Sequence, residues 1–150
     1  MNIENIMLKS VGTVLPDTPF SDLLSTHLKS ESRQLYVVDE KGRLLGVLSN
    51  YDLLKLIAPD YLDSNLARSL HEDGRFFGDF IEKMKNKTAK DLMVKEFVAV
   101  KPGETVLEAS ILIREKRFFA LPVVDENNIL LGEVARSQIL SHVARACGIS

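Results

Sequence analysis

The chain has 150 residues, 45% of them hydrophobic and none of them Trp, so it can form a globular core made mainly of aliphatic side chains. Its formal net charge of −2 argues against a dedicated nucleic-acid-binding protein, which usually carries an excess of basic residues. A single cysteine excludes an internal disulfide, and neither a signal peptide nor an apolar run of roughly 20 residues is present, which predicts a soluble, cytoplasmic protein.

The first part of the chain predicts the order strand, helix, strand, strand, helix. Apolar side chains recur at helical spacing after a turn at Pro16, and two β-type segments flank the turn residues 39–42. The expected elements are a strand (13–15), a helix (20–28), two hairpin strands (35–38 and 44–48) and a helix that begins at Asn50.

The next segment, residues 59–86, predicts a helical insert. Its apolar residues follow helical spacing, and Asp73-Gly74 predicts a break between two short helices. The simplest interpretation of Phe76, Phe77 and Phe80 is packing onto the neighbouring domains. A lid or a partner-binding face is the alternative.

The last part of the chain repeats the first at a constant offset. The block LYVVDE at 35–40 returns as LPVVDE at 121–126, and Gly46 returns as Gly132 (132 − 46 = 86). The second copy predicts a strand (97–100), a helix after a capping box at Thr105 and Glu108, a hairpin (121–124 and 129–134) and a helix from Arg136. We therefore expect an α/β (α+β) protein with repeat 1 at 1–58 and repeat 2 at 87–150, each β-α-β-β-α.

These motifs resemble the CBS domain, which occurs as tandem pairs called Bateman modules. The resemblance rests on the two VVDE blocks and on residues 46–52, GVLSNYD, which are similar to the family's Gly, two apolar residues, Ser or Thr, two variable residues and Asp or Asn. It implies two repeats packed through their sheets around a pseudo-twofold axis, with two clefts between them and a homodimer as the common assembly. It also implies a non-catalytic ligand sensor without a cofactor, which binds AMP, ADP, ATP or a related adenosine ligand and acts in signal transduction on a separate effector protein.

The predicted ligand site lies where the second hairpin strand of repeat 1 ends and the helix from Asn50 begins. Free N–H groups at a helix N-terminus favour phosphate, to which the Ser49 hydroxyl can also donate. The Asp52 carboxylate can accept hydrogen bonds from both ribose hydroxyls. The resemblance adds wall residues and residues from repeat 2 that reach across the cleft: Met7, Gly12, Ser32, Arg33, Val47 and Leu48 as walls, Arg117 or Arg136 for phosphate, and Phe118 or Phe119 for stacking on the base.

Each of these assignments has a structural alternative. Ser49 and Asp52 are also favourable N-cap and N3 residues of a helix, and this role is compatible with ligand binding. The basic residues around Arg117 can form a solvated helix end, and Phe118 and Phe119 can belong to the core.

Repeat 2 departs from the motif. Ala135 stands at the position of Ser49 and Gln138 at that of Asp52, so the hydroxyl and the carboxylate are both missing. An amide cannot act as a bidentate anion. Glu133 would repel phosphate if it pointed inward, and orientation towards solvent is the alternative. We therefore expect one competent site around Asp52 and one degenerate or empty site.

No catalytic or metal-binding pattern accompanies these motifs. The three histidines are dispersed without metal-ligand spacing, and the sequence has no P-loop, G-x-S-x-G or dinucleotide-binding fingerprint. The leading hypothesis is a regulatory nucleotide-binding module and not an enzyme. The alternative is a structural dimerisation or interaction module without a ligand; nucleic-acid binding and membrane insertion are not expected.

Overall fold

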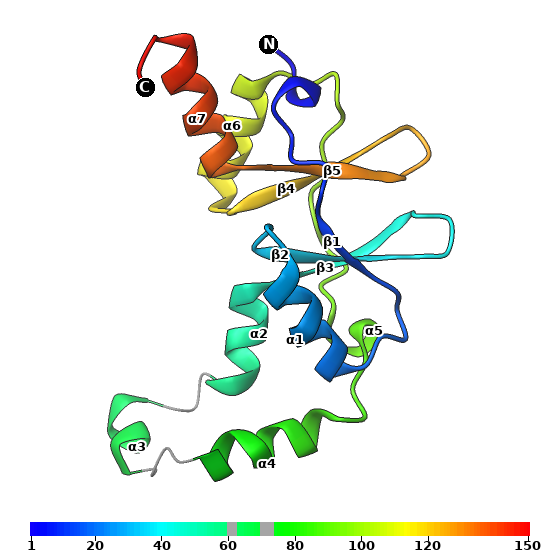
Figure 1. The fold of residues 1–150 in the computed structure, drawn as a ribbon, viewed down its shortest axis with the longest axis vertical. Helices are drawn as coiled ribbons and strands as arrows, with labels where there is room; N and C mark the ends of the chain where they lie inside the picture. Colours follow the sequence, from blue (N-terminus) through cyan, green and yellow to red (C-terminus); the bar gives the residue numbers. More distant parts are fainter. Residues whose placement is uncertain (60–62, 70–73) are drawn as a thin grey trace.

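A computed structural model describes residues 1–59, 63–69 and 74–150 of the chain. Two α/β halves are stacked along the long axis of the molecule (Figure 1), with their sheets facing each other at the centre and their helices outside. This is the mixed α/β architecture that the sequence predicts. No helix in the described ranges is long and apolar enough to cross a membrane.

Repeat 1 forms a three-stranded sheet in which β2 lies between β1 and β3. Strand β1 is parallel to β2, and β2 is antiparallel to β3. All five residues of β2 are buried, as its central position requires, which explains the apolar run in the sequence. The elements are β1 (Gly12–Val14), α1 (Phe20–Lys29), β2 (Gln34–Val38), β3 (Leu44–Ser49) and α2 (Asn50–Ile57).

Repeat 2 forms the equivalent antiparallel hairpin between two helices. Its elements are α6 (Val106–Lys116), β4 (Ala120–Val124), β5 (Leu130–Ala135) and α7 (Arg136–Ala146). The strand predicted at 97–100 is reduced to a single parallel bridge between Val100 and Val123. We attribute this difference to Pro122, which has no N–H to extend the pairing, whereas Tyr36 supplies one in repeat 1.

The segment before β1 crosses over to repeat 2. It contains the 3-10 turn η1 (Ile3–Asn5), whose first residue is fully buried in the core of repeat 2. Further along, Leu8 and Glu133 exchange two backbone hydrogen bonds, of 2.8 and 2.9 Å, so the segment lies against β5.

The leading segment of repeat 2, before α6, makes the reciprocal crossing. Helix α5 (Ala89–Leu92) packs on the core of repeat 1, and Val94 exchanges two backbone hydrogen bonds with Val47 on β3. Each half of the fold is therefore completed by the leading segment of the other repeat. The division into 1–58, 59–86 and 87–150 remains our proposal for the domain organisation.

The two crossings predict unequal sensitivity at two equivalent glycines. A Cβ added at Gly132 would overlap the backbone carbonyl oxygen of Leu8, whereas one at Gly46 would meet the Met93 side chain, 2.7 Å from Sδ. Because a side chain can move more easily than a paired backbone, we expect Gly132→Ala to lower the free energy of unfolding by roughly 1–3 kcal/mol and Gly46→Ala by less. Urea unfolding followed by circular dichroism measures both, and equal losses would contradict this account.

The hairpin turns of the two repeats pair with each other. The Leu44 N–H donates to the Asn128 carbonyl and the Leu130 N–H donates to the Gly42 carbonyl, both at 3.0 Å. Gly42 has φ 85° and Asn128 φ 64°, so two equivalent residues adopt the same left-handed conformation. Tyr36, together with apolar residues of both halves, fills the space between the sheets. The cavities described below thus lie between closely joined repeats.

The insert contains the helices α3 (Ser64–Ser69) and α4 (Gly74–Met84), and α4 runs along the outer side of repeat 1 (Figure 1). Phe80 packs edge-on against Phe20, with ring centroids 5.7 Å apart, which agrees with the packing interpretation, whereas Phe77 is exposed. Of the predicted break, Asp73 lies outside the described residues and Gly74 is the first residue of α4.

Candidate functional site

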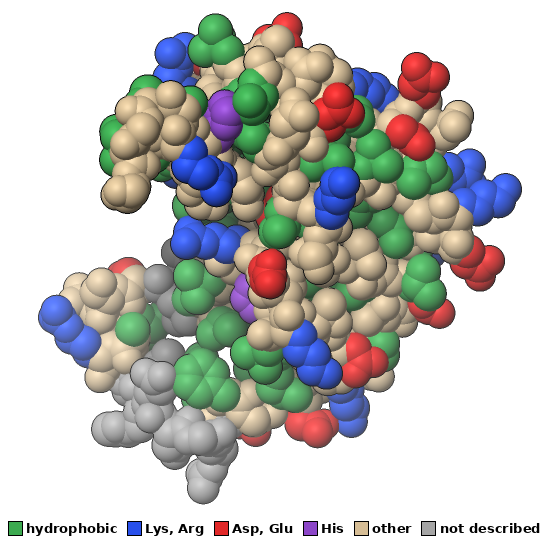
Figure 2. Space-filling model, turned by 45° about the horizontal axis from the view of Figure 1, so that its top comes forward, with side chains coloured by type: hydrophobic (Ala, Val, Ile, Leu, Met, Phe, Trp, Pro, Cys, Tyr) green, Lys and Arg blue, Asp and Glu red, His purple; other side chains and the backbone are tan. Residues whose placement is uncertain are grey.

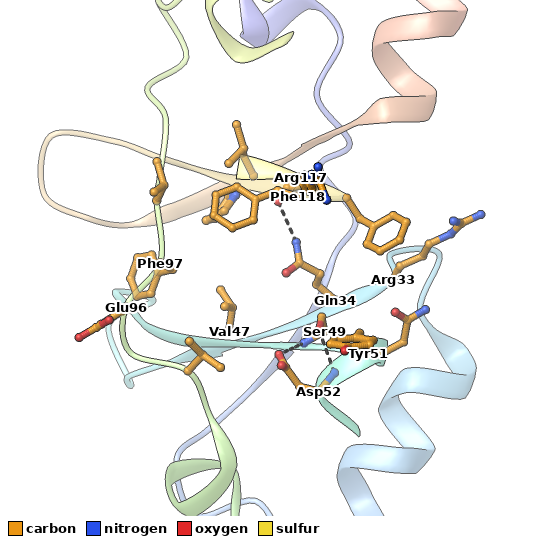
Figure 3. Close-up of a pocket in the computed structure, with 17 residues that line it drawn as sticks. Arg33, Gln34, Val47, Ser49, Tyr51, Asp52, Glu96, Phe97, Arg117 and Phe118 are labelled. Carbon is orange, nitrogen blue, oxygen red and sulfur yellow. Dashed lines mark hydrogen bonds between the residues drawn. The ribbon is translucent and has the colours of Figure 1, made fainter. Parts of the chain in front are cut away.

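A cavity of about 280 Å³ lies between repeat 1 and repeat 2, where β3 ends and α2 begins (Figure 3). In the space-filling view, a hollow opens between the two halves, with Lys or Arg side chains on both of its sides (Figure 2). We call the cavity of about 280 Å³, between the end of β3 and the start of β4, the first cavity. Its apolar wall is formed by Val47, Val94, Phe97, Val98, Phe118 and Pro122.

Ser49 and Asp52 lie together at the polar side of the first cavity (Figure 3). The Ser49 hydroxyl accepts a hydrogen bond from the Asp52 N–H at 3.0 Å, and Asp52 Oδ2 accepts one from the Ser49 N–H at 3.0 Å. This capping box ends strand β3 and starts α2. The capping role is therefore present. The second carboxylate oxygen, Oδ1, lies 3.9 Å from Lys55 Nζ and accepts no hydrogen bond from the described residues.

Two arginines from different repeats border the first cavity. Arg33 directly precedes β2, and Arg117 caps the C-terminus of α6 in the left-handed conformation, with φ 59°. Both side chains are exposed. The lining also contains the acidic residues Asp52 and Glu96, so charges of both signs surround the apolar wall.

An equivalent second cavity, of about 290 Å³, lies where β5 ends and α7 begins. Gln138 Oε1 accepts a hydrogen bond from the Ala135 N–H at 2.6 Å, which reproduces half of the capping box with a neutral amide. Glu31 stands at the position that Arg117 has in the first cavity. The second cavity therefore lacks the hydroxyl and carboxylate pair of the first.

Glu133 points inward and not towards solvent. Its side chain lines the second cavity but is only 2% exposed. Glu133 Oε1 accepts hydrogen bonds from the Tyr36 hydroxyl at 2.6 Å and from Ser32 Oγ at 2.7 Å, both in repeat 1. Val47 is the equivalent residue of the first cavity, so a carboxylate lies beside the second cavity where the first has an apolar wall. Negative charge in this position disfavours phosphate.

Burial of Tyr36 and the negative charge of the adjacent Glu133 raise the pKa of the phenol well above its ordinary value of 10.0. Because this pKa is higher in the folded than in the unfolded chain, its stabilising contribution is complete below about pH 10 and is lost as the pH rises towards the folded-state pKa. We expect the free energy of unfolding to fall more steeply between about pH 9 and 11 in the wild type than in Tyr36→Phe. Urea titrations across this range test the difference, and parallel profiles would contradict it.

Three predicted wall residues of repeat 1 do not line the first cavity: Gly12, Ser32 and Leu48. Alternate residues of a strand face opposite sides of a sheet, so Val47 faces the cavity while Leu48 is buried in the core of repeat 1. Gly12 lies on β1, closely covered by side chains of α1's C-cap and of β2. The Ser32 hydroxyl donates a hydrogen bond to Glu133.

Met7 is absent from the first cavity because the leading segments are exchanged. It packs against the core of repeat 2. The leading segment of repeat 2 supplies the missing wall through Val94, Phe97 and Val98. These are the equivalents, at the offset of 86, of residues 8, 11 and 12. The constant offset identifies these residues as equivalent. The sequence does not indicate that each leading segment packs on the other repeat.

Arg136 and Phe119 contact each other beside the second cavity. Arg136 lines the second cavity only, where its Nε donates to the Phe118 carbonyl at 2.8 Å and its guanidinium lies 4.6 Å from the centroid of the Phe119 ring. Of the two arginines proposed for phosphate, only Arg117 borders the first cavity. Phe119 borders both cavities and is 44% exposed, so it is not a core residue.

The structure also adds lining residues that sequence reasoning missed: Gln34, Asn50, Tyr51 and Glu96. Asn50 and Tyr51 occupy the variable positions of the motif. Gln34 was recognisable as a polar residue at the start of a buried strand. Within the described ranges, no group of three or more His, Cys, Asp or Glu side chains is arranged to hold a metal ion.

Comparison with known proteins places this geometry in a family. The family model of the CBS domain matches residues 3–59 and 89–145, which together make up most of the chain. The chain belongs to the CBS domain family. Its two repeats form a CBS pair, which is a regulatory module and not an enzyme, as the sequence predicts.

Relatives of the CBS pair include a plant and an archaeal protein. The chain is 29% identical over 138 residues to CBSX2 of Arabidopsis thaliana, named as chloroplastic, and covers 58% of that protein's length with 88% of its own. It is 28% identical over 151 residues to the uncharacterised protein MJ1426 of Methanocaldococcus jannaschii, covering 93% of the chain and 89% of the relative.

Solved structures of CBS pairs share the fold. The crystal structure of CBSX2 in complex with AMP has a TM-score of 0.75 at 25% identity, over 97% of this chain and 98% of the other. The cytosolic domain of the Mg²⁺ channel MgtE in complex with ATP has a TM-score of 0.66 at 25% identity, over 91% of this chain and 46% of the other.

Proposed function

We propose that this CBS pair binds an adenosine nucleotide, AMP, ADP, ATP or a related molecule, in the first cavity and signals its presence to a separate protein. The observation that carries the proposal is the position of Ser49 and Asp52 at the start of α2, beside an apolar wall and two arginines. The AMP complex of CBSX2 and the ATP complex of the MgtE domain support the ligand class.

Each chemical part of such a ligand has a matching side of the cavity. Asp52 Oδ1 is available to ribose hydroxyls, since the helix cap uses only Oδ2. The N-terminus of α2, with Arg33 and Arg117, offers positive potential to phosphate. Val47 and Phe97 provide apolar surface for a purine, and Phe119 is placed at the rim of the cavity.

Isothermal titration tests the proposal directly. The ligands are AMP, ADP, ATP, S-adenosylmethionine and cyclic di-AMP, each added to folded, nucleotide-free protein. We expect at least one to bind, with about one molecule per chain, because the second cavity lacks the hydroxyl and carboxylate pair. Two equal sites would contradict the asymmetry, and no binding would contradict the proposed function.

A structural interaction module is the second candidate, and the exposed helix faces favour it. Leu54 on α2 and Leu140 on α7 are equivalent residues, 56% and 68% exposed. We propose that these faces pair with a second copy of the chain, as the family resemblance implies. Light scattering after size exclusion, with and without nucleotide, gives the molar mass of the particle and so shows whether one or two copies of the chain are present. The cytoplasmic location stays a prediction from the sequence.

A further inference from the structure

Gln34 places an amide group inside the first cavity. It is the first residue of β2 and only 8% exposed, yet it belongs to the cavity lining. Figure 3 shows its side chain in the space between Ser49 and the Phe118 side of the cavity, with the oxygen turned towards the side that contains Val47 and Phe97. A buried amide in an otherwise apolar wall restricts which ligand group can lie beside it.

The hydrogen-bond partners of Gln34 fix which way the amide faces. Its Nε2 donates to the Ala120 carbonyl oxygen at 3.1 Å, and a carbonyl oxygen can only accept. Nε2 also lies 3.3 Å from the Tyr36 hydroxyl, whose single proton is directed to Glu133 at 2.6 Å. The hydroxyl therefore accepts from Gln34. Both partners require the nitrogen on their side, which leaves Oε1 facing the other way.

This oxygen is an accessible acceptor without a donor. No hydrogen bond among the described residues uses Gln34 Oε1. Among the described residues, His27 Nδ1 is the one side-chain polar atom that is both fully buried and without a partner. Gln34 Oε1 has no partner either, so it is not fully buried and is reachable from the cavity. A ligand group beside it gains a hydrogen bond if it is a donor and meets a repelling lone pair if it is an acceptor.

The second cavity has no counterpart of this amide. Ala120 is the residue equivalent to Gln34, and Pro122 is equivalent to Tyr36. A chain of hydrogen bonds links Glu133 of repeat 2 through Tyr36 to Gln34. It therefore orients an amide in the first cavity alone.

We propose that Gln34 selects the base of the ligand, and that Oε1 accepts a hydrogen bond from the exocyclic 6-amino group of adenine. A 6-oxo purine presents an acceptor at the same place and is disfavoured. The inference rests on the proposed function, because it assigns specificity within the same site. Tyr36 and Glu133 act as positioning residues that hold the amide.

The test compares 6-amino with 6-oxo nucleotides: AMP with IMP, and ATP with ITP, by isothermal titration of the wild type. We expect the 6-oxo ligand to bind roughly tenfold more weakly or worse, as loss of one buried hydrogen bond implies. Gln34→Met, which keeps the length of the side chain but removes the acceptor, is expected to bring the ratio of the two dissociation constants close to one.

Two further variants separate this inference from the proposed function. Asp52→Asn is expected to weaken both ligands by similar factors and leave the ratio unchanged, whereas Tyr36→Phe is expected to reduce the ratio through the loosened amide. Equal wild-type affinities, or a ratio unchanged in Gln34→Met, would overturn base selection while nucleotide binding stands. No binding of either ligand pair to the wild type would overturn both. If Gln34→Met does not fold, the wild-type ratio and Tyr36→Phe decide.

Discussion

Asp52→Asn is expected to weaken nucleotide binding by roughly 10- to 150-fold. The substitution removes the negative charge from the group that we assign to the ribose hydroxyls, and hydrogen bonds to a charged group contribute roughly 1.5–3 kcal/mol. The asparagine oxygen can still accept the Ser49 N–H, so the capping box at the start of α2 is retained. The loss then reports on the ligand and not on the helix.

Gln138→Ala provides the matched control in the second cavity. Gln138 is the residue equivalent to Asp52, and its side chain bonds the Ala135 N–H across the same capping geometry. Its replacement is expected to change the dissociation constant by less than about twofold. Titration of both variants with the nucleotide that the wild type binds gives the comparison. An unchanged affinity in Asp52→Asn, or an equal loss in Gln138→Ala, would place the site elsewhere.

The repeat made most of the fold predictable. The offset that relates LYVVDE to LPVVDE placed both hairpins, and the helix starts at Asn50 and Arg136 follow from the motif and its copy. The strand at 97–100 was the exception. There the general pattern failed because Pro122, a single residue on the neighbouring strand, cannot donate a hydrogen bond.

The walls of the site were less predictable, because they depend on how the chain crosses between repeats. Ser49 and Asp52 carry a local signal and lie at the cavity, as does Val47 beside them. Met7 carries only an apolar side chain, which would fit either half. Two repeats of the same pattern offer two similar surfaces to each leading segment, and the choice is made by tertiary packing that neither composition nor spacing expresses.

The contacts of the polar residue Glu133 were also not predictable from the sequence. A glutamate in a strand is usually solvent-exposed, and its partners Tyr36 and Ser32 lie about a hundred residues away in the sequence. The residues equivalent to Glu133, Tyr36 and Ser32 in the opposite repeat are Val47, Pro122 and Phe118. These polar contacts therefore have no counterpart at the equivalent positions, which breaks the symmetry of the pair. Comparison of the two copies could have flagged these residues as unlike, but not as neighbours.

Glu133→Val is expected to lower the free energy of unfolding by roughly 2–4 kcal/mol. It gives repeat 2 the residue that repeat 1 has at Val47, with little change in volume, but removes the acceptor of the Tyr36 and Ser32 hydroxyls. Each buried donor left without a partner costs about 1–3 kcal/mol. Ser32 Oγ also lies 3.0 Å from the Gln34 carbonyl oxygen, so the larger share of the loss is expected at Tyr36.

The double variant Glu133→Val with Tyr36→Phe distinguishes a lost polar partner from general disruption of the interface. Because the phenol donor and its carboxylate acceptor are removed together, no Tyr36 hydroxyl is left unpaired, and the loss of stability is expected to be smaller than the sum of the two single losses by roughly 0.5–3 kcal/mol. Urea unfolding of the four proteins at pH 7 provides the cycle. Additive losses would show that the carboxylate and the phenol contribute independently, and that the 2.6 Å contact does not join the two repeats energetically.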